Sequence, residues 1–380
     1  MREHHPGSRP LSKPKMKLLV LAQIPPPLHG QSAMVRTLVA GLPPLGIKLH
    51  HVNLQLSRDT ADIGRWRPGK LFAVLGACVR TLGARFRHGC DTLYYIPAPA
   101  KRGALYRDWL VLLLCRPFFR RLVLHWHAAG LGEWLRTHAT APERWLAQLF
   151  LGRADLALVL GEALRADAAV LRPRQVAVVR NGIPDPCPGF VRPPVKTPRV
   201  RTALFVGLGL ASKGVFDALA GVGLANQSAG LNRWRLVVAG DLPDPAAAVE
   251  LREHARRGEG SLELAGFVSG ATKRELFARA DALVFPTYYP AETQGLVVAE
   301  ALAYDLPVIV TDWRAVAENL PTTRVECVAI RSPAAIAAAL GRLTTLPPPD
   351  GSLRAWFLQH YTVERHLAAI AAALRGLERS

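Results

Sequence analysis

The most informative stretch of this 380-residue sequence is Pro286-Thr-Tyr-Tyr-Pro-Ala-Glu-Thr-Gln-Gly-Leu-Val-Val-Ala-Glu300. A buried strand is predicted to end near Pro286, a loop carries Glu292, and a helix begins near Gly295. Free backbone N–H groups at a helix start bind anions, and Gly295 lets a phosphate approach closely. Glu300 lies about 8 Å further along the helix axis, at 1.5 Å per residue. The spacing suits a nucleotide-sugar with a carboxylate on either side of its diphosphate, although two solvated glutamates fit the spacing alone about as well.

Short apolar runs that are typical of buried strands alternate with longer helical patterns along the chain. Strands at this spacing indicate a parallel sheet covered by helices on both faces, so the predicted class is α/β with doubly wound sheets. In the first half the predicted strands are Lys17–Ile24, Leu49–Leu54, Thr92–Ile96, Arg121–Trp126, Leu156–Leu160 and Val176–Val179. In the second half they are Thr202–Gly207, Arg235–Ala239, Leu262–Leu264, Ala282–Pro286 and Pro307–Val310.

A proline-rich segment divides the chain into two halves. Asn181–Val200 contains six prolines and no sustained periodicity, which is typical of a linker. We therefore expect a disordered lead-in over 1–16, an N-terminal domain over 17–183, a linker over 184–200 and a C-terminal domain over 201–352. A last helical pattern, Leu353–Glu378, predicts a C-terminal helix over 353–380 that packs back toward the N-terminal domain. Ligands bind beyond the carboxyl ends of parallel strands, so the cleft between the domains is the expected site.

Several motifs together resemble the family 4 retaining glycosyltransferases of the glycosyl transferases group 1. Glu292 and Glu300, with seven residues between them and followed by Ala-Leu-Ala-Tyr-Asp-Leu-Pro-Val-Ile at 301–309, are similar to the family signature. The resemblance covers about residues 17–370 and implies the GT-B fold, two Rossmann-like domains facing across a cleft, with the donor on the C-terminal domain and the acceptor on the N-terminal one. Matching pieces in the expected order are PPLHGQS at 26–32, VRNGI at 179–183, FVGLGLASKG at 205–214, LVVAGD at 236–241 and the stretch from Phe267 to Pro286.

The resemblance also implies roles for individual residues. Lys213 contacts the donor diphosphate, Glu292 binds donor sugar hydroxyls, and His127 points into the cleft near the sugar; these three form the predicted catalytic set. Glu300 is expected to bind the ribose. The full predicted donor-binding set is Gly30, Gly207, Lys213, Gly240, Phe267, Glu292, Thr293, Gln294, Gly295, Leu296 and Glu300.

Simpler interpretations exist for some of these positions. A Lys-Gly pair at 213–214 is commonly a solvated capping loop, and Gly30 fits an ordinary strand–helix turn. His125 and His127 share one strand face, but no acidic or cysteine cluster completes a metal site beside them. His125 is therefore expected to be a packed, hydrogen-bonded strand residue.

The sequence departs from the family pattern at two positions. Leu208 stands where the family commonly has an arginine that pairs with the lysine on the diphosphate, so Lys213 is expected to act alone or with an arginine of the N-terminal domain. Asp305 stands where the family usually has glycine, and Asp tolerates the left-handed backbone that such a turn needs. Neither departure indicates an inactive enzyme.

Positive charge is concentrated in the N-terminal half. The chain has 48 Lys+Arg against 29 Asp+Glu, a net charge of +19, and residues 1–190 account for +16 with 27 basic and 11 acidic side chains. Segments 64–88 and 101–121 interleave arginines with apolar residues, as helices on anionic membranes do. Helices packed on the sheet with solvated arginines fit each segment as well, but the charge excess favours membrane contact. The candidate membrane or acceptor residues are Arg65, Arg67, Lys70, Arg80 and Arg85.

Other features bear on compartment and partners. The five cysteines are isolated, as in a reducing compartment, and the apolar run Leu18–Ala22 is too short for a signal peptide. We therefore expect a cytoplasmic protein peripherally associated with the inner face of the membrane. No nucleic-acid-binding motif is present, so no nucleic acid partner is expected.

The predicted function is a retaining glycosyltransferase. It would move a sugar from a nucleoside-diphosphate-sugar to an acceptor hydroxyl of a lipid-linked glycan in surface polysaccharide or lipopolysaccharide biosynthesis. The expected acceptor is a glycan or a polyprenyl-diphosphate-linked molecule. Fixed positive groups stabilise the leaving diphosphate and the chain offers no DxD-like ligand pair, so no metal and no cofactor are expected. Two alternatives stay open: a sugar-nucleotide epimerase, and a non-catalytic basic membrane or nucleic-acid adaptor on the same scaffold. The base, sugar, acceptor and oligomeric state are not predicted.

Overall fold

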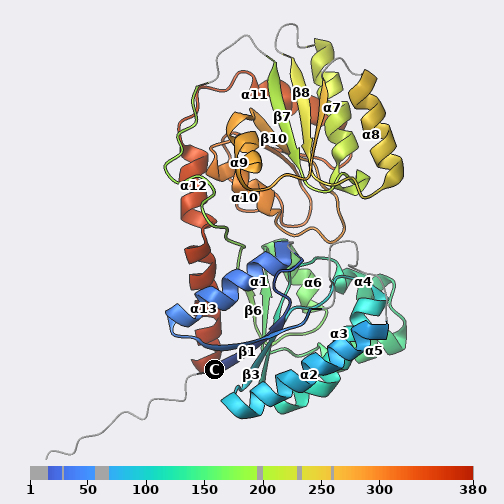
Figure 1. Cartoon of the computed structure of the whole chain (residues 1–380), viewed down its shortest axis with the longest axis vertical. Helices are drawn as coiled ribbons and strands as arrows, with labels where there is room; N and C mark the ends of the chain where they lie inside the picture. Colours follow the sequence, from blue (N-terminus) through green and yellow to red (C-terminus); the bar gives the residue numbers. More distant parts are fainter. Residues whose placement is uncertain are drawn as a thin grey trace, which may run out of the picture.

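The computed structural model describes residues 16–27, 30–55, 68–194, 200–228, 233–257 and 261–379. Two α/β domains are stacked along its long axis, each built on a six-stranded parallel sheet (Figure 1). The predicted class of two doubly wound sheets is confirmed. The predicted lead-in lies outside the described residues except for Met16, which is buried, and so do residues 195–199 of the predicted linker.

The N-terminal sheet has the strand order β2-β1-β3-β4-β5-β6, and every pairing is parallel. The order reverses direction between β1 and β3, which makes the loops after these strands a switch point where ligands bind. The strands are β1 Lys17–Ala22, β2 Lys48–Asn53, β3 Thr92–Tyr95, β4 Arg121–His125, β5 Leu156–Val159 and β6 Val176–Val178.

Helices cover both faces of this sheet because its strands are apolar on both sides. The helices α2 Pro68–His88, α3 Arg102–Cys115 and α5 Ala141–Phe150 pack on one face. The helices α1 Gly30–Gly41 and α13 Val363–Arg379 pack on the other. Neighbouring residues therefore face opposite layers: Tyr94 contacts the α1/α13 layer and Tyr95 the α2/α3/α5 layer. Shorter elements of this domain are α4 Leu131–Thr137, α6 Arg165–Ala169, η1 Pro43–Leu45, η2 Arg116–Phe118 and η3 Glu162–Leu164.

The C-terminal sheet has the strand order β12-β11-β10-β7-β8-β9, which is the Rossmann order with its switch point between β7 and β10. The strands are β7 Arg201–Val206, β8 Trp234–Ala239, β9 Leu262–Gly266, β10 Ala282–Phe285, β11 Val308–Thr311 and β12 Val325–Val328. One face carries α7 Val215–Ser228, α8 Pro245–Arg257 and α11 Pro333–Leu343. The other carries α9 Gly270–Arg279, α10 Leu296–Ala303 and α12 Ser352–His360.

Two features differ from the sequence prediction. Strand β12 was not predicted, because this short edge strand is half-exposed and has no apolar run. The single helix predicted over Leu353–Glu378 is wrong, since the chain forms α12 and α13 with a break at Tyr361 and Thr362. The break is where the chain crosses between domains: Ile183 N donates to Tyr361 O at 2.8 Å and forms a parallel bridge with Thr362. A helix could not pair with the first crossing in this way.

Candidate functional site

The switch point of the C-terminal sheet brings two long loops together, because β7 and β10 are adjacent strands. The loop after β7 contains η4 Ala211–Lys213, which ends at Gly214 in the left-handed conformation with φ of 81°. A Cβ at Gly214 would lie 2.2 Å from the carbonyl oxygen of Pro286 at the end of β10, so only glycine fits there. This close approach places Lys213 against the loop that follows β10.

Lys213 and Glu292 form a largely buried ion pair at this point. Lys213 Nζ lies 2.6 Å from Glu292 Oε2, and the two side chains are 17% and 10% exposed. The same ammonium lies 4.5 Å from the ring centroid of Tyr289, a cation–π distance. Thr287 Oγ1 lies 3.5 Å from Glu292 Oε2, and Thr293 N donates to Oε1 at 3.3 Å. The carboxylate of Glu292 is therefore fixed in direction, and the Lys213 ammonium balances its charge.

Backbone hydrogen bonds hold the shape of the loop after β10, which carries Glu292 and is called the glutamate loop below. Tyr288 N donates to Ser212 O at 2.8 Å, which joins the glutamate loop to the loop after β7 that carries Lys213, the lysine loop. Trp313 Nε1 donates to Tyr289 O at 2.8 Å, and Glu292 N donates to the same carbonyl at 2.9 Å. The position of the carboxylate is thus set by the loops after β7, β10 and β11 together.

Two helix N-termini from different domains meet beside this loop. Helix α10 begins after Gly295, whose φ is 70° and where a Cβ would lie 2.7 Å from the Phe285 ring. Helix α1 begins at Gly30, and a Cβ there would lie 3.6 Å from Leu296 Cδ1. Neither helix has an acidic residue in its first turn. The positive ends of both helices therefore converge on one place, as an anion such as a diphosphate requires.

Direct bonds join the two domains beside this loop. Ala129 N donates to Ala291 O at 3.3 Å, which joins the loop after β4 to the glutamate loop. Glu133 on α4 pairs with Arg314 at 2.6 Å, and the guanidinium lowers the pKa of that carboxyl. These contacts join the two domains close to the buried Lys213–Glu292 pair and the two helix N-termini.

The comparisons with known proteins agree with this geometry. Residues 200–345 match the family model of the glycosyl transferases group 1. The C-terminal domain is therefore similar in sequence to the glycosyl transferases group 1. This match agrees with the predicted glycosyltransferase class over the C-terminal domain, and assignment to family 4 stays a prediction. The predicted GT-B fold is confirmed by the two parallel sheets and by the solved structures described next. No curated protein matches the chain in sequence.

Solved structures resemble this chain over nearly their whole length. A sucrose-phosphate synthase from Thermosynechococcus elongatus is 16% identical with a TM-score of 0.70, covering 96% of this chain and 99% of that one. HepE from Anabaena in complex with UDP is 17% identical with a TM-score of 0.67, covering 95% and 100%. The lipopolysaccharide outer core galactosyltransferase WaaB is 14% identical with a TM-score of 0.68, covering 95% and 99%. At these identities the likeness shows the fold.

The remaining predicted donor residues of this group 1 domain lie at the carboxyl edge of its sheet. Gly207 follows β7, Gly240 follows β8, and Phe267 follows β9 with 69% of its surface exposed. Glu300 on α10 pairs with Lys273 on α9 at 2.6 Å. No sequence pattern had marked Lys273, because its partner is 27 residues away on another helix.

Thr293 and Gln294 are buried rather than open to the cleft. Gln294 Oε1 accepts the backbone N–H of Asn181 at 2.8 Å, so this side chain ties the glutamate loop to the N-terminal domain. Leu208 is 43% exposed in the loop that carries Lys213. Asp305 has a φ of 50°, so it adopts the left-handed backbone conformation that the sequence predicted at this position.

His127 follows β4 in the loop that contacts Ala291. Its Nε2 lies 3.2 Å from His125 Nδ1, and the two ring centroids are 4.1 Å apart. His125 is fully buried, as predicted for a packed strand residue. In the described part of the chain no group of three or more His, Cys, Asp or Glu side chains could hold a metal ion.

The candidate membrane residues do not join the cleft. Arg65 and Arg67 lie outside the described residues. Lys70, Arg80 and Arg85 lie on α2, which covers the outer face of the N-terminal sheet (Figure 1). Within the described residues, no helix has both the length and the apolar character needed to cross a membrane.

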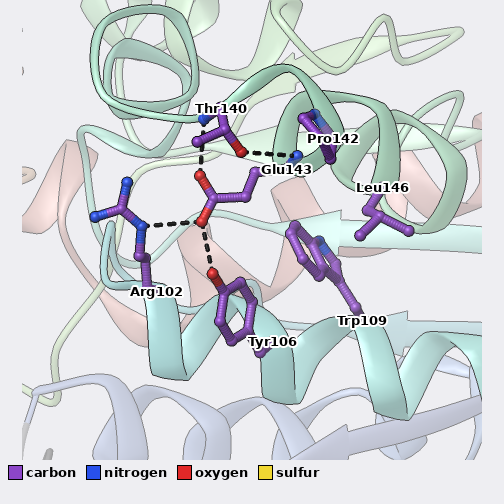
Figure 2. A pocket seen from close by; sticks show the side chains of 7 residues that line it. All are labelled: Arg102, Tyr106, Trp109, Thr140, Pro142, Glu143 and Leu146. Carbon is purple, nitrogen blue, oxygen red and sulfur yellow. Dashed lines mark hydrogen bonds and ion pairs between the residues drawn. The ribbon is translucent and has the colours of Figure 1, made fainter.

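An open cavity of about 600 Å³ lies in the N-terminal domain between α3 and α5 (Figure 2). Its polar end is closed by Glu143, which accepts hydrogen bonds from Tyr106 Oη at 2.6 Å, Arg102 Nε at 2.9 Å and Thr140 N at 2.8 Å. These bonds, that from Tyr106 first, lower the pKa of Glu143 to about 2. Its other end is apolar, lined by Trp109, Pro142 and Leu146. Sequence reasoning had not singled out this cavity, which is separate from the Lys213–Glu292 pair.

Proposed function

We propose that this protein is a retaining, metal-independent glycosyltransferase that moves a sugar from a nucleoside-diphosphate-sugar to an acceptor hydroxyl. One observation carries the proposal: the buried Lys213–Glu292 pair lies at the switch point of the C-terminal sheet, in the loop system from which α10 begins beside the start of α1. Ligands of open α/β sheets bind at such points, and convergent positive groups select an anion.

Each group has a step to perform. The bond between the anomeric carbon and the diphosphate oxygen breaks, and negative charge builds on the leaving diphosphate. Lys213 and the N–H groups at the starts of α10 and α1 stabilise that charge without a metal ion. The acceptor oxygen bonds to the anomeric carbon on the face that the leaving group occupied, and its proton passes to the departing phosphate oxygen. Glu292 and His127 hold the sugar hydroxyls and Glu300 the ribose.

A nucleotide-sugar donor is supported by the solved structures. Those of Anabaena HepE, similar in fold, were obtained in complex with UDP and with UDP-glucose. The donor is tested by a thermal-shift panel of UDP-, GDP-, ADP- and dTDP-sugars on the full chain. A ligand at 100 times its Kd should stabilise the folded state by about 2.7 kcal/mol, and Lys213→Ala should weaken the shift. The control is Lys48→Ala, which removes an exposed lysine at the far end of β2.

The two alternatives give different results in product analysis. A transferase passes the sugar to an acceptor or, slowly, to water, with release of the nucleoside diphosphate, and Glu292→Ala abolishes both. An epimerase returns an altered sugar without such transfer, and an adaptor shows neither product nor a nucleotide-dependent shift. The absence of any shift with all four nucleotides would overturn the donor site.

We further propose that the acceptor is a lipid-linked glycan reached at the cytoplasmic face of an anionic membrane. Support comes from α2, α3 and α5, which lie side by side on one face of the N-terminal domain (Figure 1). Ten of the 19 exposed large hydrophobic side chains in the described residues lie there, counting the turn η2: Leu71, Phe72, Leu75, Val79, Phe86, Tyr106, Leu113, Phe118, Trp145 and Leu149. Residues 68–121 also have ten basic and only two acidic side chains.

The exposed apolar side chains of α2 form a stripe. Phe72, Val79 and Phe86 recur every seven residues and are 73%, 70% and 66% exposed, whereas Val74 and Cys78 on the opposite side are buried. Helix α2 therefore packs against the sheet with one side and exposes a second apolar side, which is flanked by arginines. An anionic bilayer accepts both features, because apolar side chains enter the acyl boundary and arginines bind lipid phosphates. The α3/α5 cavity is lined by residues of two of these helices (Figure 2).

A further inference from the structure

Arg314 reaches from the C-terminal domain into the N-terminal domain and has no role in the chemistry above. It lies in the loop after β11 with a φ of 54°, a left-handed backbone conformation that strains any residue with a large side chain. The side chain is 22% exposed, and Arg314 Nη2 lies 2.6 Å from Glu133 Oε2 on α4. A strained arginine thus stands where its side chain makes a contact between the two domains.

The guanidinium of Arg314 lies near two carboxylates of the N-terminal domain. Glu133 is in the first turn of α4, and its hydrogen bond to Arg314 lowers the pKa of its carboxyl. Asp167 on α6 is buried, and its Oδ1 accepts Gly132 N at 2.7 Å and Glu133 N at 3.1 Å. Burial raises the pKa of Asp167, and the charge of Arg314 is among the effects that lower it. Arg314 therefore contributes positive charge to both acidic groups from the other domain.

These two carboxylates hold the start of α4, which directly follows the loop that carries His127. Gly130 ends that loop with a φ of 92°. A Cβ at Gly130 would lie 3.8 Å from Arg314 Nη2 and 3.5 Å from Pro290 O, and the residue before Gly130 donates a hydrogen bond to the glutamate loop. The end of this loop therefore lies against both Arg314 and the glutamate loop.

Within its own domain, Arg314 is joined to the Lys213–Glu292 pair through two rings. Its guanidinium carbon lies 4.9 Å from the centroid of the Trp313 ring. Trp313 Nε1 donates to Tyr289 O at 2.8 Å, and Lys213 Nζ lies 4.5 Å from the centroid of the Tyr289 ring. The loop after β4, Arg314 and the buried ion pair are therefore linked by a continuous series of contacts.

We propose that Arg314 is a positioning residue that holds the loop of His127 against the glutamate loop, so that His127 and Glu292 face the same donor sugar. The proposal rests on the proposed function, in which both of these residues bind the sugar. Most of the groups proposed to bind the diphosphate and the ribose belong to the C-terminal domain, so donor binding needs little of this contact. Transfer needs groups of both domains in register, so loss of Arg314 should lower kcat more than donor affinity.

Two arginines with left-handed backbone provide a matched pair of variants. Arg314→Gly removes the guanidinium and relaxes the backbone. Arg153→Gly relaxes an exposed arginine with a φ of 56°, which precedes β5 and has no side-chain hydrogen bond or ion pair to the residues that the structure describes. Arg314→Gly should lower kcat about tenfold, the factor expected for one lost charge-assisted hydrogen bond, and keep the donor Kd within about threefold. Arg153→Gly should change neither value.

Two further variants test the charge and the ion pair. Arg314→Lys retains the positive charge and should keep most of the kcat that Arg314→Gly loses. Glu133→Gln removes the charge of the partner, and adding it to Arg314→Gly should lower kcat no further, because the two side chains act through one contact. Additive losses of kcat would overturn the proposed contact.

Amide hydrogen exchange of the full chain without substrate tests the loop itself. Arg314→Gly should speed exchange over residues 127–133 at least about tenfold, because the bonds of Ala129, Gly132 and Glu133 N–H groups open more often, and Arg153→Gly should not. Unchanged exchange in Arg314→Gly, or a loss of donor binding as large as the loss of kcat, would overturn the proposal. Exchange needs no activity, so failure of the proposed function would be seen separately, as the absence of transfer by the unaltered protein.

Discussion

Lys213 Nζ and Glu292 Oε2 are 2.6 Å apart and nearly buried. In the proposed function, the cation that would bind the diphosphate is thus paired with the carboxylate that would bind the sugar. An incoming donor replaces the contact between these two side chains with its own contacts to each of them. Both side chains are already desolvated and oriented when the donor arrives. Little reorganisation is then needed when charge develops on the leaving diphosphate.

Removing Lys213 should cost both activity and stability. We expect Lys213→Met to lower kcat at least about 100-fold, the loss typical of one oriented transition-state donor. It should also lower the free energy of unfolding by about 3 kcal/mol, because Glu292 is left as a largely buried charge. Urea unfolding and initial rates measure the two effects, with Lys48→Met as the control. Adding Glu292→Gln should restore most of the stability but none of the activity; additive losses would contradict the pairing.

Leu208→Arg should strengthen donor binding. The side chain is 43% exposed on the lysine loop, so an arginine can extend toward the diphosphate without repacking. A second cation, planar and bidentate, should lower the donor Kd about tenfold at low salt, with a smaller effect at high salt. Calorimetric titration measures it. A Kd that is unchanged at all salt concentrations would mean that the diphosphate lies away from Leu208.

Glu318 should control closure of the cleft. Its carboxylate accepts the backbone N–H groups of Glu162 and Ala163, both at 2.6 Å, at the start of η3 in the other domain. Glu318→Ala should increase the radius of gyration measured by small-angle scattering and raise the donor KM several-fold, because both bonds are charge-assisted. Glu326→Ala removes a surface partner of Arg342 within one domain and should change neither value. Equal behaviour of the two variants would contradict this role.

Stability should rise with pH between about pH 4 and pH 6.5 through His366. Its folded-state pKa is lowered to about 4, so in this window the unfolded chain binds a proton that the folded chain does not. The difference of about 2.5 pH units from its ordinary value corresponds to about 3 kcal/mol lost on acidification. Urea unfolding from pH 4 to pH 7 measures the slope. His366→Asn should flatten it, and an unchanged slope in this variant would assign it to other groups.

The apolar stripe of α2 should bind anionic membranes. We expect Phe72→Ser with Phe86→Ser to reduce sedimentation with vesicles of mixed anionic and zwitterionic lipid at least about tenfold, because two exposed rings are lost. Arg80→Glu with Arg85→Glu should have a similar effect that disappears in zwitterionic vesicles. The control is Val249→Ser, an exposed apolar residue on α8 of the other domain. Undiminished binding of both α2 variants would place the membrane contact elsewhere.

Much of the fold and of the donor loops followed from the sequence alone. Buried parallel strands are apolar on both faces, so eleven of the twelve strands stood out as short runs between helical patterns. Phosphate-binding loops need glycine where the backbone turns left-handed or approaches closely, and Gly214 and Gly295 meet that need. Local chemistry of this kind is encoded in neighbouring residues, so a pattern along the chain can reveal it.

Only the tertiary structure decided which distant groups meet. Lys213 and Glu292 are 79 residues apart and meet because the parallel sheet places the ends of β7 and β10 at one edge. His125 and His366 are 241 residues apart and meet because α13 packs on the N-terminal sheet. The break between α12 and α13 has the same origin, since Ile183 pairs with Tyr361 only when both crossings lie side by side. Burial then lowers the pKa of both His125 and His366, because the cost of desolvation depends on the surroundings of a side chain and not on its neighbours in the chain.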